Sequence, residues 1–151
     1  MTELVLDASV VIKWWRSDGE QDVPQARALR ASFETGDLAV IVPPLLFLEI
    51  LNAFGRWWAW PEDELIVLAS ALTSLRFEVE EPELERVAAW TARGLTAYDA
   101  AYVAVAEARD IQLVTSDGLI LEKAPGLARP LSGRLPNGAM GPEAGGWVRD
   151  S

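Results

Sequence analysis

Short apolar runs alternate along the chain with longer segments in which apolar residues recur every three or four positions. The runs have the length and composition of strands, and they cover residues 4–6, 38–42, 77–80, 111–114 and 128–131. The longer segments predict helices over residues 8–16, 22–35, 43–60, 82–93, 96–110 and 118–123, with a further helix beginning at Pro61. Strands that alternate with helices are typical of an α/β fold, so we expect a mostly parallel central sheet of about four to five strands.

Length and C-terminal composition predict the domain organisation. A chain of 151 residues is expected to form one compact domain whose core needs no disulfide. From Gly133 onward the chain is rich in Gly and Pro and shows no periodicity. We therefore predict one domain over residues 1–132 and a flexible tail over residues 133–151.

Composition excludes many kinds of chemistry. The chain has no Cys and no His, which excludes thiolate nucleophiles, Ser-His-Asp triads and the usual zinc and haem ligands. A net charge of −10 argues against a general nucleic-acid coat protein, because phosphate binding needs basic charge. Any catalysis must use carboxylates, hydroxyls, Lys or Arg, or a metal ion held by oxygen ligands.

No targeting or membrane segment is recognisable. The N-terminus lacks a basic start, and Asp7 ends its first apolar run. The longest apolar run, residues 39–48, contains two prolines and is shorter than the roughly 20 residues that a bilayer requires. We expect a soluble, cytoplasmic protein.

Four acidic residues lie at informative places. Asp7 and Asp117 each follow a predicted strand, and Asp99 lies in the first turn of a predicted helix. Ligands of open α/β sheets bind outside the carboxyl ends of the strands, so these acids are expected to share one cleft. Glu49 is the single charge in the apolar helix LLFLEILNAF. Clustered carboxylates repel one another unless a cation intervenes, and oxygen ligands favour Mg²⁺ or Mn²⁺.

Each acid also has a purely structural interpretation. Asp7 is a plausible N-cap, Asp117 suits a turn, and Glu49 suits a solvent-facing position. The segment from Thr96 to Asp99 matches a capping box, so Asp99 also suits the role of a helix cap. These structural interpretations are less convincing when they are taken together, because they require acids to fall independently at successive strand ends and helix starts.

Four stretches, taken in order, resemble PIN-domain ribonucleases, and within them the VapC-type toxin of VapBC toxin–antitoxin modules. They are Val5-Leu6-Asp7-Ala8-Ser9-Val10-Val11, Val42-Pro43-Pro44-Leu45 with Glu49 and Asn52-Ala53, residues 96–106 (TAYDAAYVAVA), and Leu113-Val114-Thr115-Ser116-Asp117. Each stretch alone is a weak signal, whereas the set of four spans nearly the whole predicted domain.

The resemblance implies a three-layer α/β/α sandwich and a Mg²⁺- or Mn²⁺-dependent endoribonuclease. It implies that Asp7 and Asp99 are the principal metal ligands. It also implies that Glu49 and Asp117 complete the site, directly or through water, and help to orient the attacking water. The residues implied to support this catalytic and metal-binding quartet are Ser9, Asn52, Thr115 and Ser116. The implied partners are an RNA substrate, a cognate antitoxin protein and a second copy in a homodimer.

Aromatic and basic residues add candidates for partner and substrate contacts. Adjacent Trp side chains on a helix point about 100° apart, so each Trp pair is expected to leave one ring at the surface. The candidates for an antitoxin groove or dimer contact are Trp15, Trp57, Trp58 and Trp60. The candidates for phosphate contacts are Lys13, Arg16, Arg56 and Arg93.

Two other functions are also consistent with parts of the sequence. The net charge and the Trp residues also suit a non-catalytic PIN-like scaffold that binds partners. A phosphotransfer domain of receiver or haloacid-dehalogenase type also carries acids after its first strand. A haloacid-dehalogenase-type site needs a second acid two residues after the first, and Ser9 occupies that position here. A receiver needs an Asp that accepts the phosphoryl group after a central strand, whereas Pro43 follows the predicted strand over residues 38–42. The phosphotransfer function is therefore disfavoured.

Overall fold

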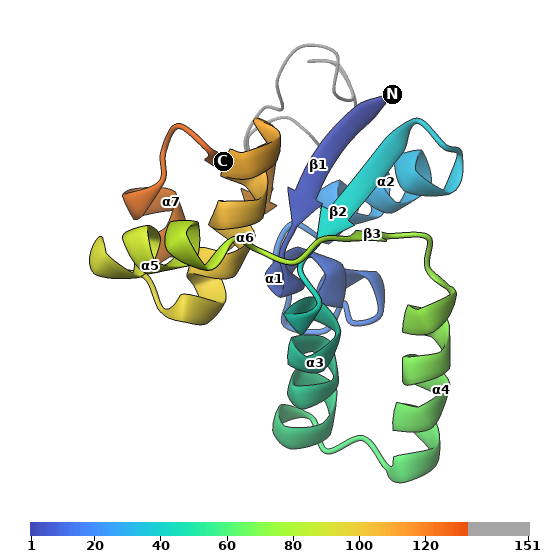
Figure 1. Ribbon diagram of the computed structural model, residues 1–151. Coiled ribbons are helices and arrows are strands. Elements are labelled where there is room, and N and C mark those ends of the chain that lie inside the picture. Colours follow the sequence, from blue (N-terminus) through green and yellow to red (C-terminus); the bar gives the residue numbers. More distant parts are fainter. Residues whose placement is uncertain (133–151) are drawn as a thin grey trace.

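A five-stranded sheet, parallel throughout, forms the centre of the protein (Figure 1). The computed structural model describes residues 1–132, and the predicted tail at 133–151 lies outside the described residues. The strand order is β3-β2-β1-β4-β5. The strands are β1 (Thr2–Leu6), β2 (Leu38–Val42), β3 (Glu78–Val79), β4 (Gln112–Thr115) and β5 (Ala128–Pro130). The prediction of a mostly parallel sheet is confirmed.

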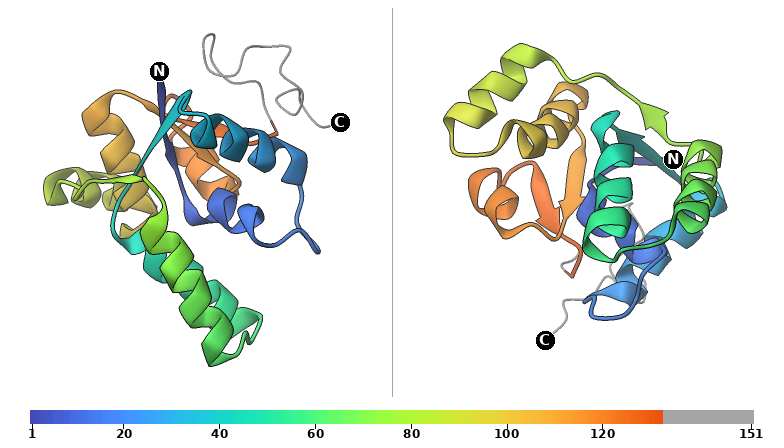
Figure 2. Two further views of the ribbon diagram at one scale, coloured as in Figure 1. Left: turned by 90° about the vertical axis from the view of Figure 1, so that its right-hand side faces the viewer. Right: turned by 90° about the horizontal axis from the view of Figure 1, so that it is seen from below.

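Helices cover both faces of this sheet and give three layers. They are α1 (Ala8–Val11), the 3₁₀ turn η1 (Ile12–Trp14), α2 (Val23–Glu34), α3 (Leu45–Asn52), the π turn η2 (Ala53–Trp57), α4 (Glu62–Ser74), α5 (Leu84–Ala92), α6 (Ala97–Arg109) and α7 (Gly118–Lys123). Helix α2 packs against β2, and α6 packs against β1 and β4. Figure 2 shows α2 and α6 on opposite sides of the sheet. The predicted α/β/α architecture is therefore confirmed.

Helix α6 lies at the centre of the core. Its residues from Ala100 to Ala106 are all buried, because the sheet covers one side and α5 covers another. Small Ala side chains allow this close approach on several faces. The start of α6, which carries Asp99, is consequently held in a fixed position relative to β1 and β4.

Two predicted helices are less regular than expected. The helix predicted over 8–16 is α-helical only to Val11 and then tightens into η1, and the helix predicted over 43–60 widens after Asn52 into η2. The wider turn places the rings of Trp58 and Trp60 at 5.0 and 4.4 Å from Phe54, between ring centroids. Packing of these aromatic rings explains a deviation that periodicity alone does not predict.

Helices α3 and α4 pack against each other and extend beyond the carboxyl end of the sheet (Figure 1). Within residues 1–132, no helix has both the length and the apolar composition needed to cross a membrane.

Candidate functional site

The sheet order reverses between β1 and β4, and two of the predicted acids follow these strands. β2 and β3 lie on one side of β1, and β4 and β5 lie on the other. Asp7 follows β1 directly, and Asp117 lies two residues beyond the end of β4. The carboxyl ends of the strands beside such a reversal form the usual ligand crevice of an open α/β sheet. The topology therefore places both acids at one crevice.

Asp7 is held by two hydroxyl groups that belong to different segments. Ser9 Oγ donates to Asp7 Oδ1 at 2.5 Å, and Thr115 Oγ1 donates to Asp7 Oδ2. Each hydroxyl in turn accepts a backbone N–H: Ser9 from Ser116 at 3.0 Å, and Thr115 from Asp117 at 2.9 Å. Because an N–H can only donate, these bonds direct both hydroxyl protons toward Asp7. The loop after β4 thus orients the acid after β1.

Burial dominates the electrostatics of Asp7. Only 4% of the residue is exposed. Burial raises the pKa of Asp7 from 3.8 to about 6, and the hydroxyl hydrogen bonds from Ser9 and Thr115 oppose that rise. The nearby charge of Asp117 raises the pKa of Asp7 further. A buried carboxylate with a neighbouring acid is a site at which a cation would be stabilising.

Asp117 and Asp99 both lie at helix starts, whereas their structural interpretations were a turn residue for Asp117 and a helix cap for Asp99. Asp117 is the N-cap of α7 and accepts from the Ile120 N–H at 2.9 Å. Asp99 is not itself the cap of α6, because Thr96 accepts the Asp99 N–H at 3.1 Å. Burial raises the pKa of Asp99, and the charge of Asp117 adds to that rise. The two acids are therefore near neighbours.

Glu49 points into the protein toward Tyr102 and not freely into solvent. Tyr102 donates its hydroxyl to Glu49 Oε1 at 2.5 Å. Burial raises the pKa of Glu49, the bond from Tyr102 lowers it, and the charge of Asp99 raises it again. The sequence reading did not single out Tyr102. The sequence feature that could have identified Tyr102 is its spacing of three residues from Asp99, because this spacing puts both side chains on one face of α6.

The four acids form a series of neighbouring pairs. Repulsion links Asp7 with Asp117, Asp117 with Asp99, and Asp99 with Glu49. Among the described residues, no group of three acids is placed so that it could hold one ion. Mg²⁺ commonly keeps several water ligands and binds only one or two carboxylates. A pair of neighbouring carboxylates therefore offers the kind of oxygen ligands that Mg²⁺ prefers, which is ligand chemistry that suits a hydrated divalent cation.

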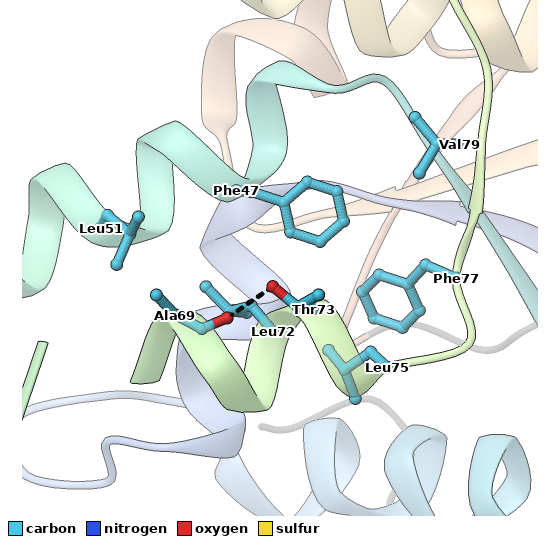
Figure 3. A pocket seen from close by; sticks show the side chains of 8 residues that line it. All are labelled: Phe47, Leu51, Ala69, Leu72, Thr73, Leu75, Phe77 and Val79. Atoms are coloured by element: carbon cyan, nitrogen blue, oxygen red, sulfur yellow. Dashed lines mark hydrogen bonds between the residues drawn. The ribbon is translucent and has the colours of Figure 1, made fainter. Parts of the chain in front are cut away.

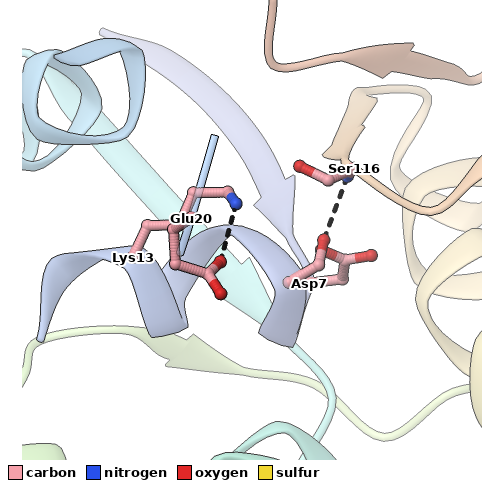
Figure 4. A network of polar contacts seen from close by, with 5 residues as sticks. Asp7, Lys13, Glu20 and Ser116 are labelled. Carbon is pink, nitrogen blue, oxygen red and sulfur yellow. Dashed lines mark hydrogen bonds and ion pairs between the residues drawn. The ribbon is translucent and has the colours of Figure 1, made fainter. Parts of the chain in front are cut away.

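The predicted supporting and basic residues have different surroundings. Asn52 is exposed at the end of α3. Lys13 is only 6% exposed and forms an ion pair with Glu20 at 2.9 Å (Figure 4). Arg16 lies over the ring of Trp58 at 4.0 Å. Arg93 covers Trp90 in the same way at 4.4 Å, and Arg56 is exposed. Lys13 is therefore the least available of the four to an external phosphate.

The expectation that each adjacent Trp pair leaves one ring at the surface is met by Trp57 and Trp58 and only partly by Trp14 and Trp15. Trp14 is buried, whereas its neighbour Trp15 is half-buried against the core. Trp57 is 77% exposed, whereas Trp58 and Trp60 are partly buried against Phe54. Of the four candidate contact residues, Trp57 presents the largest free apolar surface.

Comparison with known proteins gives one family and several similar folds. The sequence profile described as PIN domain matches residues 4–125. Three solved structures illustrate the likeness. PAE2754 from Pyrobaculum aerophilum is 24% identical, with 86% of this chain and 90% of that chain covered and a TM-score of 0.62. Mycobacterium tuberculosis VapC20, a sarcin–ricin loop cleaving toxin, is 22% identical, with 82% and 95% covered and a TM-score of 0.61. FitAcB from Neisseria gonorrhoeae is 16% identical, with 83% and 95% covered and a TM-score of 0.61. No curated protein matches the chain.

Proposed function

Because the chain belongs to the PIN domain family, we propose that it is a Mg²⁺- or Mn²⁺-dependent endoribonuclease and the toxin of a type II toxin–antitoxin pair, acting in the cytoplasm. The observation that carries the proposal is the series of coupled acids at the reversal between β1 and β4. Such a series, without His or Cys, suits phosphodiester hydrolysis through a metal ion.

Each residue of the site has a proposed task. Asp7 and Asp99 bind the cation, and Asp117 and Glu49 complete its surroundings directly or through water. When bound, the cation supplies Lewis-acid stabilisation of the phosphodiester and lowers the pKa of water. Ser9 and Thr115 keep the Asp7 carboxylate oriented through the bonds described above. Glu49 and Asp117 orient the attacking water, while Asn52 and Ser116 lie beside them for contacts with RNA.

Cleavage by the purified protein, free of any partner, tests this proposal. The probes are total RNA and a sarcin–ricin loop oligonucleotide, the substrate stated for the Mycobacterium tuberculosis protein. Both are incubated with Mg²⁺, Mn²⁺ or EDTA. We expect cleavage only with metal, and a loss of about 100-fold or more in Asp99→Asn, because losing a ligand should exceed the usual effect of losing a residue that supports one.

A matched control lies at the other end of the same helix. Asp110 is exposed and caps the C-terminus of α6 in a left-handed conformation that Asn also tolerates. Asp110→Asn makes the same chemical change far from the acids and should cleave at the wild-type rate. Cleavage that persists in EDTA, or in a folded Asp99→Asn variant at the wild-type rate, would contradict the proposal.

The α3–α4 pair supports the proposed protein partners. A cavity of about 440 Å³ opens between these helices, and Figure 3 shows Phe47, Leu51 and Phe77 on its walls. Exposed apolar side chains on these two helices are Leu48, Ile66 and Val67, and Trp57 is exposed at the end of η2, which follows α3. We propose that the antitoxin and a second copy of the chain use apolar surface of this kind. Sedimentation of wild type and Trp57→Ser tests the homodimer, since a dimer through Trp57 should weaken in the variant.

The exposed Trp57 also favours the second function, a partner-binding scaffold without catalysis. Calorimetric titration with Mn²⁺ separates the two functions. Binding that Asp99→Asn abolishes supports the nuclease. No binding at millimolar Mn²⁺, together with no cleavage of either RNA, would favour the scaffold.

A further inference from the structure

Tyr102 is a buried phenol whose partner is a charged group. The residue is 1% exposed, and its hydroxyl donates to Glu49 Oε1 at 2.5 Å. A buried hydroxyl requires a partner, and a bond to an ionised acceptor is stronger than a bond between neutral groups. This bond links α6 with α3 across 53 positions of the sequence. It therefore connects the two helices that carry Asp99 and Glu49.

Glu49 depends on this bond for its orientation. The residues on either side of it in α3, Leu48 and Ile50, are apolar, and within residues 1–132 the hydroxyl of Tyr102 is the hydrogen-bond donor found at its carboxylate. A Glu side chain has three rotatable bonds, so an unanchored carboxylate would sample many positions. Anchoring Oε1 restricts that motion.

Tyr102 is suited to hold a carboxylate and not to bind a cation itself. Burial raises the pKa of Tyr102, and the charges of Glu49 and Asp7 raise it further. The phenol therefore remains protonated and acts as a donor. Because the charge of Asp7 also reaches it, the hydroxyl lies on the side of α6 that faces the acids.

Helix α6 thus serves the site twice. Asp99 and Tyr102 are three positions apart and share a face, and the helix between them is buried in the core. Asp99 is itself one of the four acids, whereas Tyr102 acts on the site only through its hydrogen bond to Glu49. A rigid helix that fixes both groups also fixes the separation of the two acids.

We propose that Tyr102 is a positioning residue that holds Glu49 in its place in the acidic site, an inference that rests on the proposed metal-dependent nuclease. Partners that orient a metal ligand typically contribute about 10–100-fold to metal affinity or activity. The hydroxyl of Tyr102, and not its ring, supplies this contribution.

Tyr102→Phe tests the inference, because it removes only the hydroxyl and keeps the buried ring. The matched control is Tyr98→Phe, the same change one turn earlier on α6 at an exposed position. Both variants are titrated with Mn²⁺ by calorimetry and assayed for RNA cleavage, with circular dichroism as the check of folding. We expect Tyr102→Phe to lose about tenfold in Mn²⁺ affinity and in kcat with KM nearly unchanged, and Tyr98→Phe to match wild type.

A double-mutant cycle shows whether Tyr102 acts through Glu49. In a Glu49→Gln background, Tyr102→Phe should change Mn²⁺ affinity by less than about twofold, because the carboxylate that it positions is already gone. If Tyr102 had a merely structural role, the fold-loss in Mn²⁺ affinity caused by Tyr102→Phe would instead multiply with the fold-loss caused by Glu49→Gln. Full multiplication of the two losses overturns the inference.

The outcomes separate this inference from the proposed function. If wild type neither binds Mn²⁺ nor cleaves RNA, the nuclease proposal fails. If wild type does both and Tyr102→Phe equals it, the positioning role alone fails. If Tyr102→Phe does not fold, Glu49→Asp replaces it, since a carboxylate one carbon shorter withdraws from the hydroxyl. Unchanged Mn²⁺ affinity in Glu49→Asp overturns the role of Tyr102.

Discussion

Asp7 shows how one residue links stability with chemistry. Both of its carboxylate oxygens accept hydroxyl hydrogen bonds, yet burial still raises the pKa of Asp7 to about 6. A carboxyl whose folded pKa exceeds its unfolded value binds its proton more tightly when folded. The free energy of unfolding therefore falls as pH rises from about 4 through about 6. Ionised Asp7 is a local cost in the metal-free protein, of at most about 3 kcal/mol.

Asp7→Asn should make the metal-free protein more stable at pH 7 by about 1–2 kcal/mol, because the charge is removed while one hydroxyl hydrogen bond is lost. The gain should become small at pH 4, where Asp7 is almost fully protonated in the folded protein and partly protonated in the unfolded chain. Urea unfolding in EDTA between pH 4 and pH 8 measures it. A difference from wild type that stays constant across this range would contradict the assigned cause.

Thr115→Val should destabilise the protein by about 2–3 kcal/mol, since it leaves both the buried Asp7 Oδ2 and the Asp117 N–H without their partner. Thr115→Ser keeps the hydroxyl and should lose only about 1 kcal/mol for the missing methyl group. Denaturant unfolding of both variants provides the measurement. Equal losses would show that packing, and not the hydroxyl, is what matters at this position.

At the scale of elements, the edge strand β3 depends on an ionic contact. It is two residues long, and both residues are exposed. Arg109, at the end of α6, contacts Glu3 of β1 at 3.7 Å, Glu80 at 2.7 Å and Glu78 of β3. One guanidinium therefore connects α6, the centre of the sheet and its edge. Without it, three carboxylates would face one another at this edge.

Arg109→Met should destabilise the protein by about 1–2 kcal/mol, because it leaves those carboxylates uncompensated in a partly buried place. The backbone bond from Glu80 N–H to Val42 O should open more often, and hydrogen exchange at Glu80 should accelerate. Arg86→Met, which removes a more exposed Arg from its pairs with Glu83 and Glu107, is the matched control. Equal exchange at Glu80 in both variants would exclude the proposed role of Arg109.

At the scale of the whole molecule, the net charge of −10 and the mutual repulsion of the acids act together. Both oppose the approach of RNA and the ionisation of the site. Bound divalent metal would reduce both effects. Stability of the whole protein should therefore report the loading of the site.

Mn²⁺ should raise the unfolding free energy at pH 7 by about 2.7 kcal/mol at a concentration 100 times its Kd. The gain should shrink below pH 6, because protons then compete for Asp7. Thermal unfolding with and without Mn²⁺ at pH 5 and pH 7.5 measures both effects. Asp99→Asn should show a much smaller rise, and Asp110→Asn a normal one. An equal rise in both variants would place the metal elsewhere.

Local sequence patterns determined the strands, most helix boundaries, the parallel α/β class, the positions of Asp7, Asp99 and Asp117 at strand ends or helix starts, and the position of Glu49 within a helix. These features follow from periodicity, caps and turn residues, which act over a few positions. The same local signals are also consistent with purely structural roles, and Asp7 does occupy the expected N-cap position of α1, although its side chain makes no capping hydrogen bond.

Only the tertiary structure decided how these residues meet. The reversal of strand order beside β1, the bond from the Thr115 hydroxyl to Asp7, and the bond from Tyr102 to Glu49 all join segments distant in sequence. Burial, which sets the pKa of Asp7, likewise depends on the elements that cover it. Sequence spacing cannot report such contacts, because hydrogen-bond partners and desolvation arise when distant elements pack together.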